Sequence, residues 1–201
     1  MSRMYQLAYR FGVTPWESPG VQSGFRVHLA EILARSSVPG AGGRLLDIGC
    51  GTGDHSIEMA TRGWQVTGVD AVEKAIERAR VKAQTAGVSA RFVSGDVTEL
   101  PASIGCGYGL VLDVGCFHGL DETARVAYAR EVSAVTVTGA SLLMFAFSPG
   151  RRGPLPRGAS AVELEQVFTG WELSTQEIAN TEGLPTPIRK MKPYWFHLTR
   201  S

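Results

Sequence analysis

The fold is decided by one stretch of sequence, which reads Arg44-Leu45-Leu46-Asp47-Ile48-Gly49-Cys50-Gly51-Thr52-Gly53. Its first half is an apolar run of the length of a buried strand, and its second half has glycine at every other position. Glycine lets the backbone turn tightly and lets a ligand approach the main chain. A helical pattern near residues 53–62 follows, so the turn opens onto a helix N-terminus. This order predicts a pocket for a nucleotide-like ligand at the end of the strand.

Two further predicted strands lead into a carboxylate. The segment 65–70 ends at Asp70, and the segment 91–94 is followed by Gly95 and Asp96. Asp70 lies about 20 residues beyond the glycines, where an acid can accept hydrogen bonds from a ribose. Because parallel strands end at the same edge of a sheet, we expect both carboxylates on the ligand side of the fold.

Strand-like and helix-like segments alternate through the rest of the chain, which is typical of βαβ units and a parallel sheet. The last two predicted strands are joined by residues 179–193, which show no helical pattern, so we expect these strands to pair antiparallel. The predicted fold class is α/β: a Rossmann-like, seven-stranded, mostly parallel sheet with a C-terminal antiparallel strand pair and helices on both faces. The predicted strands are 44–48, 65–70, 91–94, 108–113, 141–147, 171–178 and 194–200, and the predicted helices are 27–36, 53–62, 72–86, 121–137 and 160–168.

Length and composition favour one domain spanning residues 1–201. Hydrophobic residues make up 44% of the chain and charged residues 19%, which is the balance of a folded protein. Within this domain we distinguish an N-terminal covering segment with a helix (1–42), a cofactor-binding core (43–147) and a C-terminal part with substrate-side loops (148–201). The formal net charge of +1 provides no field that would steer a polyanion, so nucleic acid is not an expected partner.

Several features favour a cytoplasmic protein without a metal centre. The start of the chain lacks the continuous apolar segment of a secretory signal, and the most apolar run, 142–147, is far too short to cross a bilayer. Cys50, Cys106 and Cys116 are odd in number and are spaced neither as zinc ligands nor as a disulfide framework. We therefore expect a reducing compartment, no membrane attachment and no metal.

The spacing of the glycines separates two classes of cofactor. A dinucleotide fingerprint, G-x-G-x-x-G, counted from Gly49 requires glycine at position 54, which is Asp54. The run is instead D-x-G-x-G-x-G, and with Asp70 and Gly95-Asp96-Val97 it resembles the class I methyltransferases that depend on S-adenosylmethionine (SAM). The resemblance covers residues 44–147 and implies SAM as cofactor and methyl transfer as the reaction.

The resemblance implies a set of cofactor-binding residues along one edge of the sheet. Alternatives remain for three of them: Asp47 organises the turn, Cys50 is a small packing residue, or Gly53 permits close helix packing. The full set is Asp47, Gly49, Cys50, Gly51, Gly53, Asp70, Ala71, Asp96, Val97 and Asp113.

Six of these residues receive definite roles from the resemblance. Asp47 and the backbone of the glycine turn, at Gly49 and Gly51, are expected to hold the methionine portion of SAM. Asp70 is expected to bind both ribose hydroxyls. Asp96 is expected to bind the adenine amino group, and the amide of Val97 the adenine ring.

The methyl acceptor is expected beyond the carboxyl ends of the parallel strands. The segment Asp113-Val114-Gly115-Cys116-Phe117-His118 lies there, and it lacks the Pro-Pro-Tyr motif of methyltransferases that act on nucleic acid bases. Base methylation therefore loses support. The segments that can build the acceptor site are 11–26, 113–120, 148–159 and 179–193.

A narrower resemblance is carried by this segment together with Thr14-Pro15-Trp16-Glu17, Asp54-His55 and Phe168-Thr169-Gly170-Trp171. These residues are similar to those of thiopurine-methyltransferase-like enzymes and the related heterocyclic toxin methyltransferases. The resemblance implies transfer to an O, S or N atom of a small aromatic or heterocyclic molecule. The loops 151–157 and 179–193 depart from it, because they carry no diagnostic motif of that group.

His118 is the candidate catalytic residue, because an imidazole can accept a proton near neutral pH. The alternative is that His118 bonds a backbone group at the turn into the next helix. Trp16, Phe117 and His118 form the predicted substrate-binding set. For Trp16 the alternatives are a cation–π contact with the sulfonium or the acceptor, and packing of the N-terminal segment onto the core.

Basic residues gather in the loops 151–157 and 189–192. They either form a solvated face or attract an anionic acceptor, including nucleic acid. Two other functions stay open beside small-molecule methylation. One is a SAM-binding sensor or partner protein without transfer activity, and the other is an RNA or protein methyltransferase.

Overall fold

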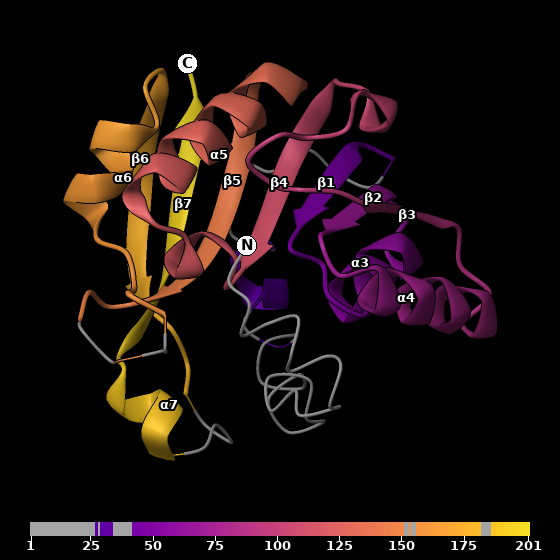
Figure 1. Cartoon of the computed structure of the whole chain (residues 1–201), viewed down its shortest axis with the longest axis horizontal. Helices are drawn as coiled ribbons and strands as arrows, with labels where there is room; N and C mark the ends of the chain where they lie inside the picture. Colours follow the sequence, from indigo (N-terminus) through magenta and orange to yellow (C-terminus); the bar gives the residue numbers. More distant parts are fainter. Residues whose placement is uncertain (1–26, 28, 34–41, 151–152, 154–155, 182–185) are drawn as a thin grey trace.

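The computed structural model describes residues 27, 29–33, 42–150, 153, 156–181 and 186–201, which form a seven-stranded sheet flanked by helices (Figure 1). The strands are β1 (Arg44–Ile48), β2 (Gln65–Asp70), β3 (Ala90–Ser94), β4 (Tyr108–Val114), β5 (Thr136–Phe147), β6 (Trp171–Ile178) and β7 (Pro193–Arg200). The helices are α3 (Asp54–Thr61), α4 (Glu73–Thr85), α5 (Glu122–Val135), α6 (Ala161–Val167) and α7 (Thr186–Lys190), with short 3-10 turns η2 (Ala102–Ile104) and η3 (Phe117–Gly119).

The sheet has the strand order β3-β2-β1-β4-β5-β7-β6. The strands β1 to β5 pair in parallel, whereas β7 lies between β5 and β6 and is antiparallel to both. This confirms the predicted fold class, including the antiparallel C-terminal pair. The carboxyl ends of the parallel strands therefore share one edge, and α7 lies beyond that edge (Figure 1).

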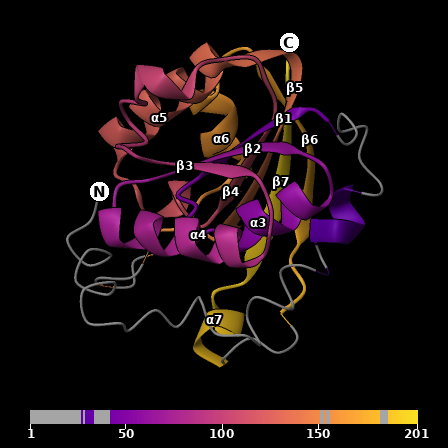
Figure 2. The ribbon, with the colours of Figure 1, turned by 90° about the vertical axis from the view of Figure 1, so that its right-hand side faces the viewer.

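Helices cover both faces of the sheet, because alternate residues of a strand point to opposite sides. Leu46 of β1 belongs to a buried cluster with Tyr128 of α5, while Leu45 belongs to a different cluster with Met59 of α3 and Leu29. In the turned view of Figure 2, α5 and α6 lie on one side of the sheet, and α3 and the helical residues near 29–33 lie on the other. The two clusters form the core.

The helices that follow β4 and β5 begin at side-chain caps. The carboxylate of Asp121 accepts a hydrogen bond from the Ala124 N–H at 2.9 Å, and the hydroxyl of Ser160 accepts one from the Glu163 N–H at 3.2 Å. Such caps satisfy backbone donors that have no partner within the helix. They fix the points at which the loops on the carboxyl edge end.

The boundary between α5 and β5 differs from the predicted one. We expected a helix to residue 137 and a strand from residue 141, but α5 ends at Val135 and β5 begins at Thr136. The β-branched run 135–138 favours extended backbone. Thr136 pairs with Tyr108 before a register shift, so the strand reaches back across the whole of β4.

The segment between β6 and β7 also differs from its prediction as a loop. It contains α7, which has only five residues and does not act as a crossover, so the antiparallel pairing is unaffected. Of the predicted helix 27–36, residues 27 and 29–33 are helical and residues 34–36 lie outside the described residues. The longest described helix is α5, and none in the described part of the chain is long and apolar enough to cross a membrane.

Candidate functional site

The turn after β1, residues 49–53, is called the first turn below. Its N–H groups are used within the protein: those of Gly49 and Cys50 donate to the carbonyl oxygen of Val69 at 2.8 and 3.1 Å, and that of Gly51 donates to the Asp70 carboxylate at 3.0 Å. In phosphate-binding glycine loops the N–H groups point at the anion. Here these three N–H groups point toward β2 instead.

Two glycines of the first turn are required by close packing. A Cβ on Gly49 would lie 2.7 Å from the Cβ of Cys116, and a Cβ on Gly53 would lie 2.8 Å from the ring of Phe92. Both glycines also have positive φ, at 71° and 80°. The Gly53 contact agrees with the packing alternative raised for this residue, and Cys50 packs beside the same ring.

The carboxylate of Asp47 is buried at the centre of this edge. It accepts a hydrogen bond from the hydroxyl of Ser56 at 2.6 Å. Burial raises the pKa of Asp47 to about 7, against the hydrogen bond from Ser56 and with further upward contributions from the negative charges of Asp113 and Asp70. Three carboxylates therefore act on one another at the ends of three neighbouring strands.

Asp70 is held by the main chain on both sides. Its Oδ2 accepts from the Gly51 N–H at 3.0 Å, and its Oδ1 accepts from the Val72 N–H at 2.8 Å. These two bonds fix the orientation of the carboxylate at the end of β2. The neighbouring Ala71, also a predicted cofactor residue, is half-buried beside it.

Asp96 and Val97 follow β3 at the same edge. The carboxylate of Asp96 is exposed and accepts from the N–H and the hydroxyl of Thr98, at 2.8 and 2.6 Å. These two bonds lower the pKa of Asp96. Val97 is buried in the hydrophobic core, with Val69 in the same cluster.

Asp113 organises the turn after β4, residues 115–119, called the second turn below. Its Oδ1 accepts from the Cys116 N–H at 2.7 Å, and its Oδ2 accepts from the Phe117 N–H at 2.9 Å and from the Tyr128 hydroxyl at 2.7 Å. Burial raises the pKa of Asp113 to about 6, although all these hydrogen bonds oppose the shift. The structure thus binds this predicted cofactor residue to groups of its own chain.

The predicted substrate residues of the second turn are both buried. The Phe117 ring packs edge-on against Tyr128 at 5.4 Å and tilted against Phe168 at 5.8 Å, within the core. His118 stacks on Phe147 with ring centroids 4.6 Å apart, and its Nδ1 accepts from the Phe147 N–H at 3.3 Å. A neutral imidazole that accepts at Nδ1 carries its proton at Nε2.

This geometry bears on the predicted base role of His118. The Phe147 bond agrees with the alternative that His118 bonds a backbone group, although that group lies on β5 and not at the turn into α5. A base acting at Nε2 requires the other tautomer, in which Nδ1–H would face the Phe147 N–H. The base role stays a prediction, and it requires the Phe147 bond to break.

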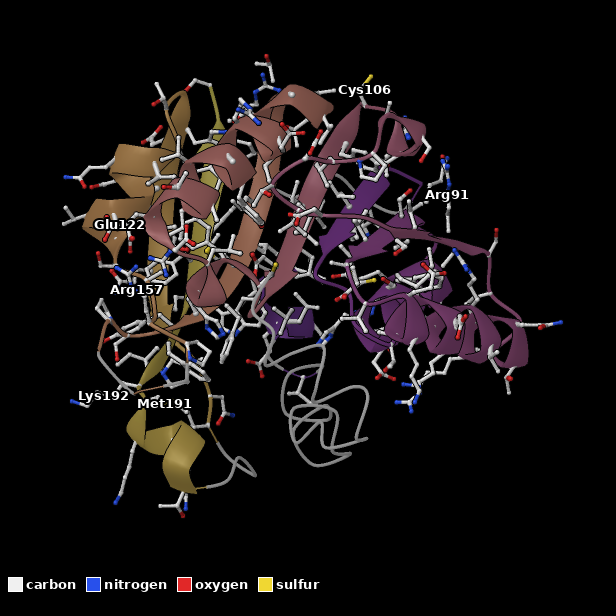
Figure 3. All side chains as sticks on the ribbon, viewed as in Figure 1. Arg91, Cys106, Glu122, Arg157, Met191 and Lys192 are labelled. Carbon is white, nitrogen blue, oxygen red and sulfur yellow. The ribbon has the colours of Figure 1, made fainter. Side chains whose placement is uncertain are left out.

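The remaining predicted residues fall into two groups. Trp16, Arg151 and Arg152 lie outside the described residues. The described basic side chains of the two loops are exposed: Arg157 pairs with Glu122 at 3.1 Å, and Lys192 points outward beyond Met191 (Figure 3). The exposed basic residues are Arg157, Arg189, Lys190 and Lys192.

Sequence reasoning missed the residues that support the site from behind. Ser56 bonds Asp47, and Tyr128 bonds Asp113. Lys82 of α4 donates to Thr52 of the first turn at 2.7 Å and to Asp54 of α3 at 2.8 Å. Arg125 is the fourth, and it is treated separately below. All four lie on helices, where a polar residue is expected at the surface. Their sequence positions therefore did not mark them as site residues.

The donor and acceptor groups at this edge fit one kind of ligand. Three buried carboxylates repel an anionic pyrophosphate and favour a cation, and the first turn directs its N–H groups away from a ligand. Carboxylates and backbone carbonyls accept hydrogen bonds from an ammonium group and from ribose hydroxyls. The fold and the site therefore define a Rossmann-like domain for a positively charged nucleoside cofactor.

Comparison with known proteins agrees with this class. Residues 45–139 match a family model described as a methyltransferase domain. An uncharacterized methyltransferase of Schizosaccharomyces pombe is 29% identical over 104 residues, which span 52% of this chain and 71% of the relative. The 2-heptyl-1-hydroxyquinolin-4(1H)-one methyltransferase of Mycobacteroides abscessus is 29% identical over 134 residues, which span 63% of this chain and 57% of that protein.

A solved structure supports the fold. The 1,6-didemethyltoxoflavin-N1-methyltransferase of Burkholderia thailandensis, solved with its substrate and S-adenosylhomocysteine, superposes with a TM-score of 0.74 at 20% identity, covering 98% of this chain and 85% of that one. The matched domain, the methyltransferase relatives and the shared fold support a class I SAM-dependent methyltransferase.

Proposed function

We propose that this methyltransferase transfers the methyl group of SAM to an O, S or N atom of a small aromatic or heterocyclic molecule. The observation that carries the proposal is the contact between Gly49 and Cys116, where a Cβ on Gly49 would lie 2.7 Å from that of Cys116. The two turns are in direct contact. A small acceptor held at the second turn is therefore beside the cofactor turn, as methyl transfer requires.

The cofactor roles follow from the positions of the carboxylates. Asp70, oriented by two backbone N–H groups, accepts from the ribose hydroxyls. Asp47 and the carbonyl oxygens of Gly49 and Gly51 accept from the ammonium group of the methionine portion. Asp96 is assigned to the adenine end of the cofactor. Its carboxylate is exposed and accepts a hydrogen bond from the Thr98 N–H.

Buried aromatic side chains gather at the carboxyl end of β5, where we place the acceptor side. His118 stacks on Phe147, and Phe145 packs edge-on against both Phe147, at 5.8 Å, and Trp195, at 5.5 Å. Aromatic walls with one polar handle are typical of sites for small aromatic ligands. The hydroxyquinolinone acceptor named for the Mycobacteroides abscessus relative belongs to this class of molecule.

The chemistry divides between cofactor and protein. SAM supplies a methyl group that is already activated by its sulfonium charge. The protein aligns donor and acceptor and excludes water. The second turn is fixed by two hydrogen bonds, from the Phe117 N–H to Asp113 and from the Phe147 N–H to His118. His118 therefore presents its Nε2–H to an electronegative acceptor atom. An acceptor that is already ionised needs no base.

We also propose that residues 1–201 act as one domain in a reducing cytoplasm. Support for one domain comes from the buried cluster that joins Leu29 and Ile32 to Leu45 of β1 and to Met191 and Trp195 near the C-terminus. The compartment is supported by the odd number of cysteines.

A panel of acceptors tests the proposal. The chain is incubated with SAM and with aromatic thiols, N-hydroxy heterocycles, phenols and ring nitrogens, and S-adenosylhomocysteine and methylated product are measured by mass spectrometry. We expect acceptor-dependent turnover on at least one class, and slower turnover with Asp70→Ala when SAM is limiting. Cofactor binding by calorimetry without turnover on any class would indicate a sensor or partner protein. Turnover only on RNA or protein would also contradict the proposal.

A further inference from the structure

A buried arginine lies behind the second turn. Arg125 of α5 is among the largest fully buried side chains of the described residues, and its relative exposure is 2%. A buried guanidinium is costly unless its donors are satisfied. Its role is therefore to be found in what its hydrogen bonds hold together.

The guanidinium of Arg125 binds three separate parts of the chain. Its Nε donates to the carbonyl oxygen of Leu120 at 2.9 Å, and its Nη2 donates to those of His118 at 3.2 Å and Gly158 at 2.7 Å. Its Nη1 is bonded to the carboxylate of Glu163 on α6. The planar fork of arginine suits such divergent bonding, which a lysine cannot reproduce.

The same guanidinium lies over the ring of Phe117, 4.8 Å from the ring centroid. Arg125 therefore contacts the second turn at Phe117 and His118, and it contacts Leu120 directly after the turn. This places the turn between two fixed groups, because the carboxylate of Asp113 holds its other side.

The loop after β5 is joined to the same network through Gly158. This glycine has a φ of 82°, and a Cβ on it would lie 2.2 Å from the carbonyl oxygen of Ser148. The next N–H, of Ala159, donates to the carbonyl oxygen of Phe147 at 2.8 Å. Phe147 in turn bonds and stacks on His118. Arg125 thus joins the second turn to residues 158–159, and the end of β5 contacts both of these segments.

We propose that Arg125, held by Glu163, is the positioning residue of the acceptor side: it sets His118 and Phe147 relative to the cofactor turn. The inference rests on the proposed function for its kinetic consequence only. The hydrogen bonds of Arg125 go to Leu120, His118, Gly158 and Glu163, all outside the first turn, so its loss is expected to spare cofactor binding.

The test uses a variant that separates positioning from stability. Arg125→Met alone leaves Glu163 without its partner, whereas Arg125→Met/Glu163→Leu replaces the whole ion pair with apolar groups, which often preserves stability. Arg130→Met on the same helix is the matched control, because Arg130 is 68% exposed and pairs only with its neighbour Glu131. Unfolding in urea reports the stability of each variant.

The first readout needs no acceptor. The ring nitrogens of His118 are followed by ¹⁵N NMR of histidine-labelled protein, and we expect the signature of a hydrogen-bonded Nδ1 in the wild type and in Arg130→Met. We expect it to be lost in the double variant. A stably folded double variant that keeps the wild-type His118 signals would overturn the proposal, whatever the fate of the proposed function.

The second readout is kinetic, with the best substrate of the acceptor panel as probe. We expect kcat/KM for the acceptor to fall about 10- to 100-fold in the double variant, as for a small misplacement of the reacting groups. The Kd for S-adenosylhomocysteine is expected to stay within about twofold. An equal loss of cofactor affinity, or unchanged turnover in a folded variant, would make Arg125 a general stability residue and contradict the inference.

Discussion

The two turns at the ligand edge follow neighbouring strands and look alike in sequence, yet they are built differently. Each follows a strand that carries a buried aspartate, Asp47 on β1 and Asp113 on β4, and each contains glycine at positive φ. The first turn donates its N–H groups to β2, to Val69 and Asp70. The second turn donates its N–H groups to the aspartate of its own strand.

The difference agrees with the proposal that the carboxylate of Asp47 serves a ligand, and it indicates that the carboxylate of Asp113 serves the fold. Asp113 accepts hydrogen bonds from Cys116, Phe117 and Tyr128, whereas the carboxylate of Asp47 accepts one from the hydroxyl of Ser56. Both are buried and both have a raised pKa. Similar burial and charge thus accompany different roles, and the hydrogen-bond partners distinguish them.

The largest effect is expected where the two turns touch. Gly49→Ala adds a Cβ at 2.7 Å from that of Cys116 and forces alanine to a φ of 71°, so we expect a loss of roughly 2–5 kcal/mol in unfolding free energy. Gly139→Ala is the control for strain alone, because its φ is 78° and no atom lies within 4 Å of the added Cβ. Urea unfolding measures both.

The contact itself is tested by Gly49→Ala/Cys116→Gly. We expect this double variant to recover the part of the loss that exceeds the Gly139→Ala control, because the clashing Cβ is gone. Strictly additive losses would mean that the two turns are not in contact and would remove the main support for the proposed function.

The second prediction contrasts the two buried aspartates through pH. The pKa of Asp47 is raised to about 7, so its ionised form is disfavoured in the fold, and the stability it contributes is fully present below the unfolded pKa near 4 and is lost as pH rises through about 7. Asp47→Asn removes this loss while keeping an acceptor for Ser56. We expect its unfolding free energy to gain on the order of 3 kcal/mol over the wild type between about pH 4 and pH 8.

Asp113→Asn is the matched comparison. The amide NH₂ would face one of the donors that now bond the carboxylate, from Phe117, Cys116 or Tyr128. We expect this variant to be less stable than the wild type at neutral pH, despite the raised pKa of Asp113. If Asp113→Asn gained stability as Asp47→Asn does, the distinction between the two carboxylates would fail.

Much of this arrangement could be read from the sequence. The strand at residues 44–48, its glycines and the alternation that follows predicted a parallel sheet, because hydrophobic runs and turn glycines are local signals. The antiparallel pair followed from the missing crossover helix. The α5 to β5 boundary was wrong because the β-branched run 135–138 outweighed a helical pattern that had been extended too far.

The candidate site was predicted less completely, for a physical reason. The residues predicted to contact a ligand lie in or beside the motif, and the resemblance named them. The residues that hold the acceptor side, such as Arg125 and Phe147, become neighbours of His118 only through the packing of α5, β5 and α6. Contacts between residues distant in sequence leave no local pattern, so only the fold brings them together.

The third prediction concerns the cofactor. Asp70→Ala removes the acceptor for the ribose hydroxyls and frees the N–H groups of Gly51 and Val72, so we expect SAM affinity to fall by about 1–3 kcal/mol. Asp96→Ala removes an exposed carboxylate that accepts from the N–H and the hydroxyl of Thr98, and we expect a smaller loss. Calorimetric titration of the two folded variants measures both. A larger loss for Asp96→Ala would reverse the assigned importance of the two strand ends.

The smallest effect is expected at His118. Its size decides whether His118 acts as a general base or as a positioning residue. His118→Asn retains an acceptor near the Phe147 N–H but removes Nε2, while His118→Ala removes both. Because Nδ1 is already committed, we expect His118→Ala to lower kcat by less than about tenfold on hydroxyl and thiol acceptors alike, below the usual contribution of a general base. His118→Asn is expected to restore most of this loss, with the Kd for SAM unchanged in both.

A base would behave differently: both variants would lose about 100-fold or more on a weakly acidic hydroxyl and far less on an ionised thiol. That pattern in the pH-dependent kcat of the two acceptors would show that the Phe147 bond breaks during turnover and that the second turn supplies chemistry as well as position.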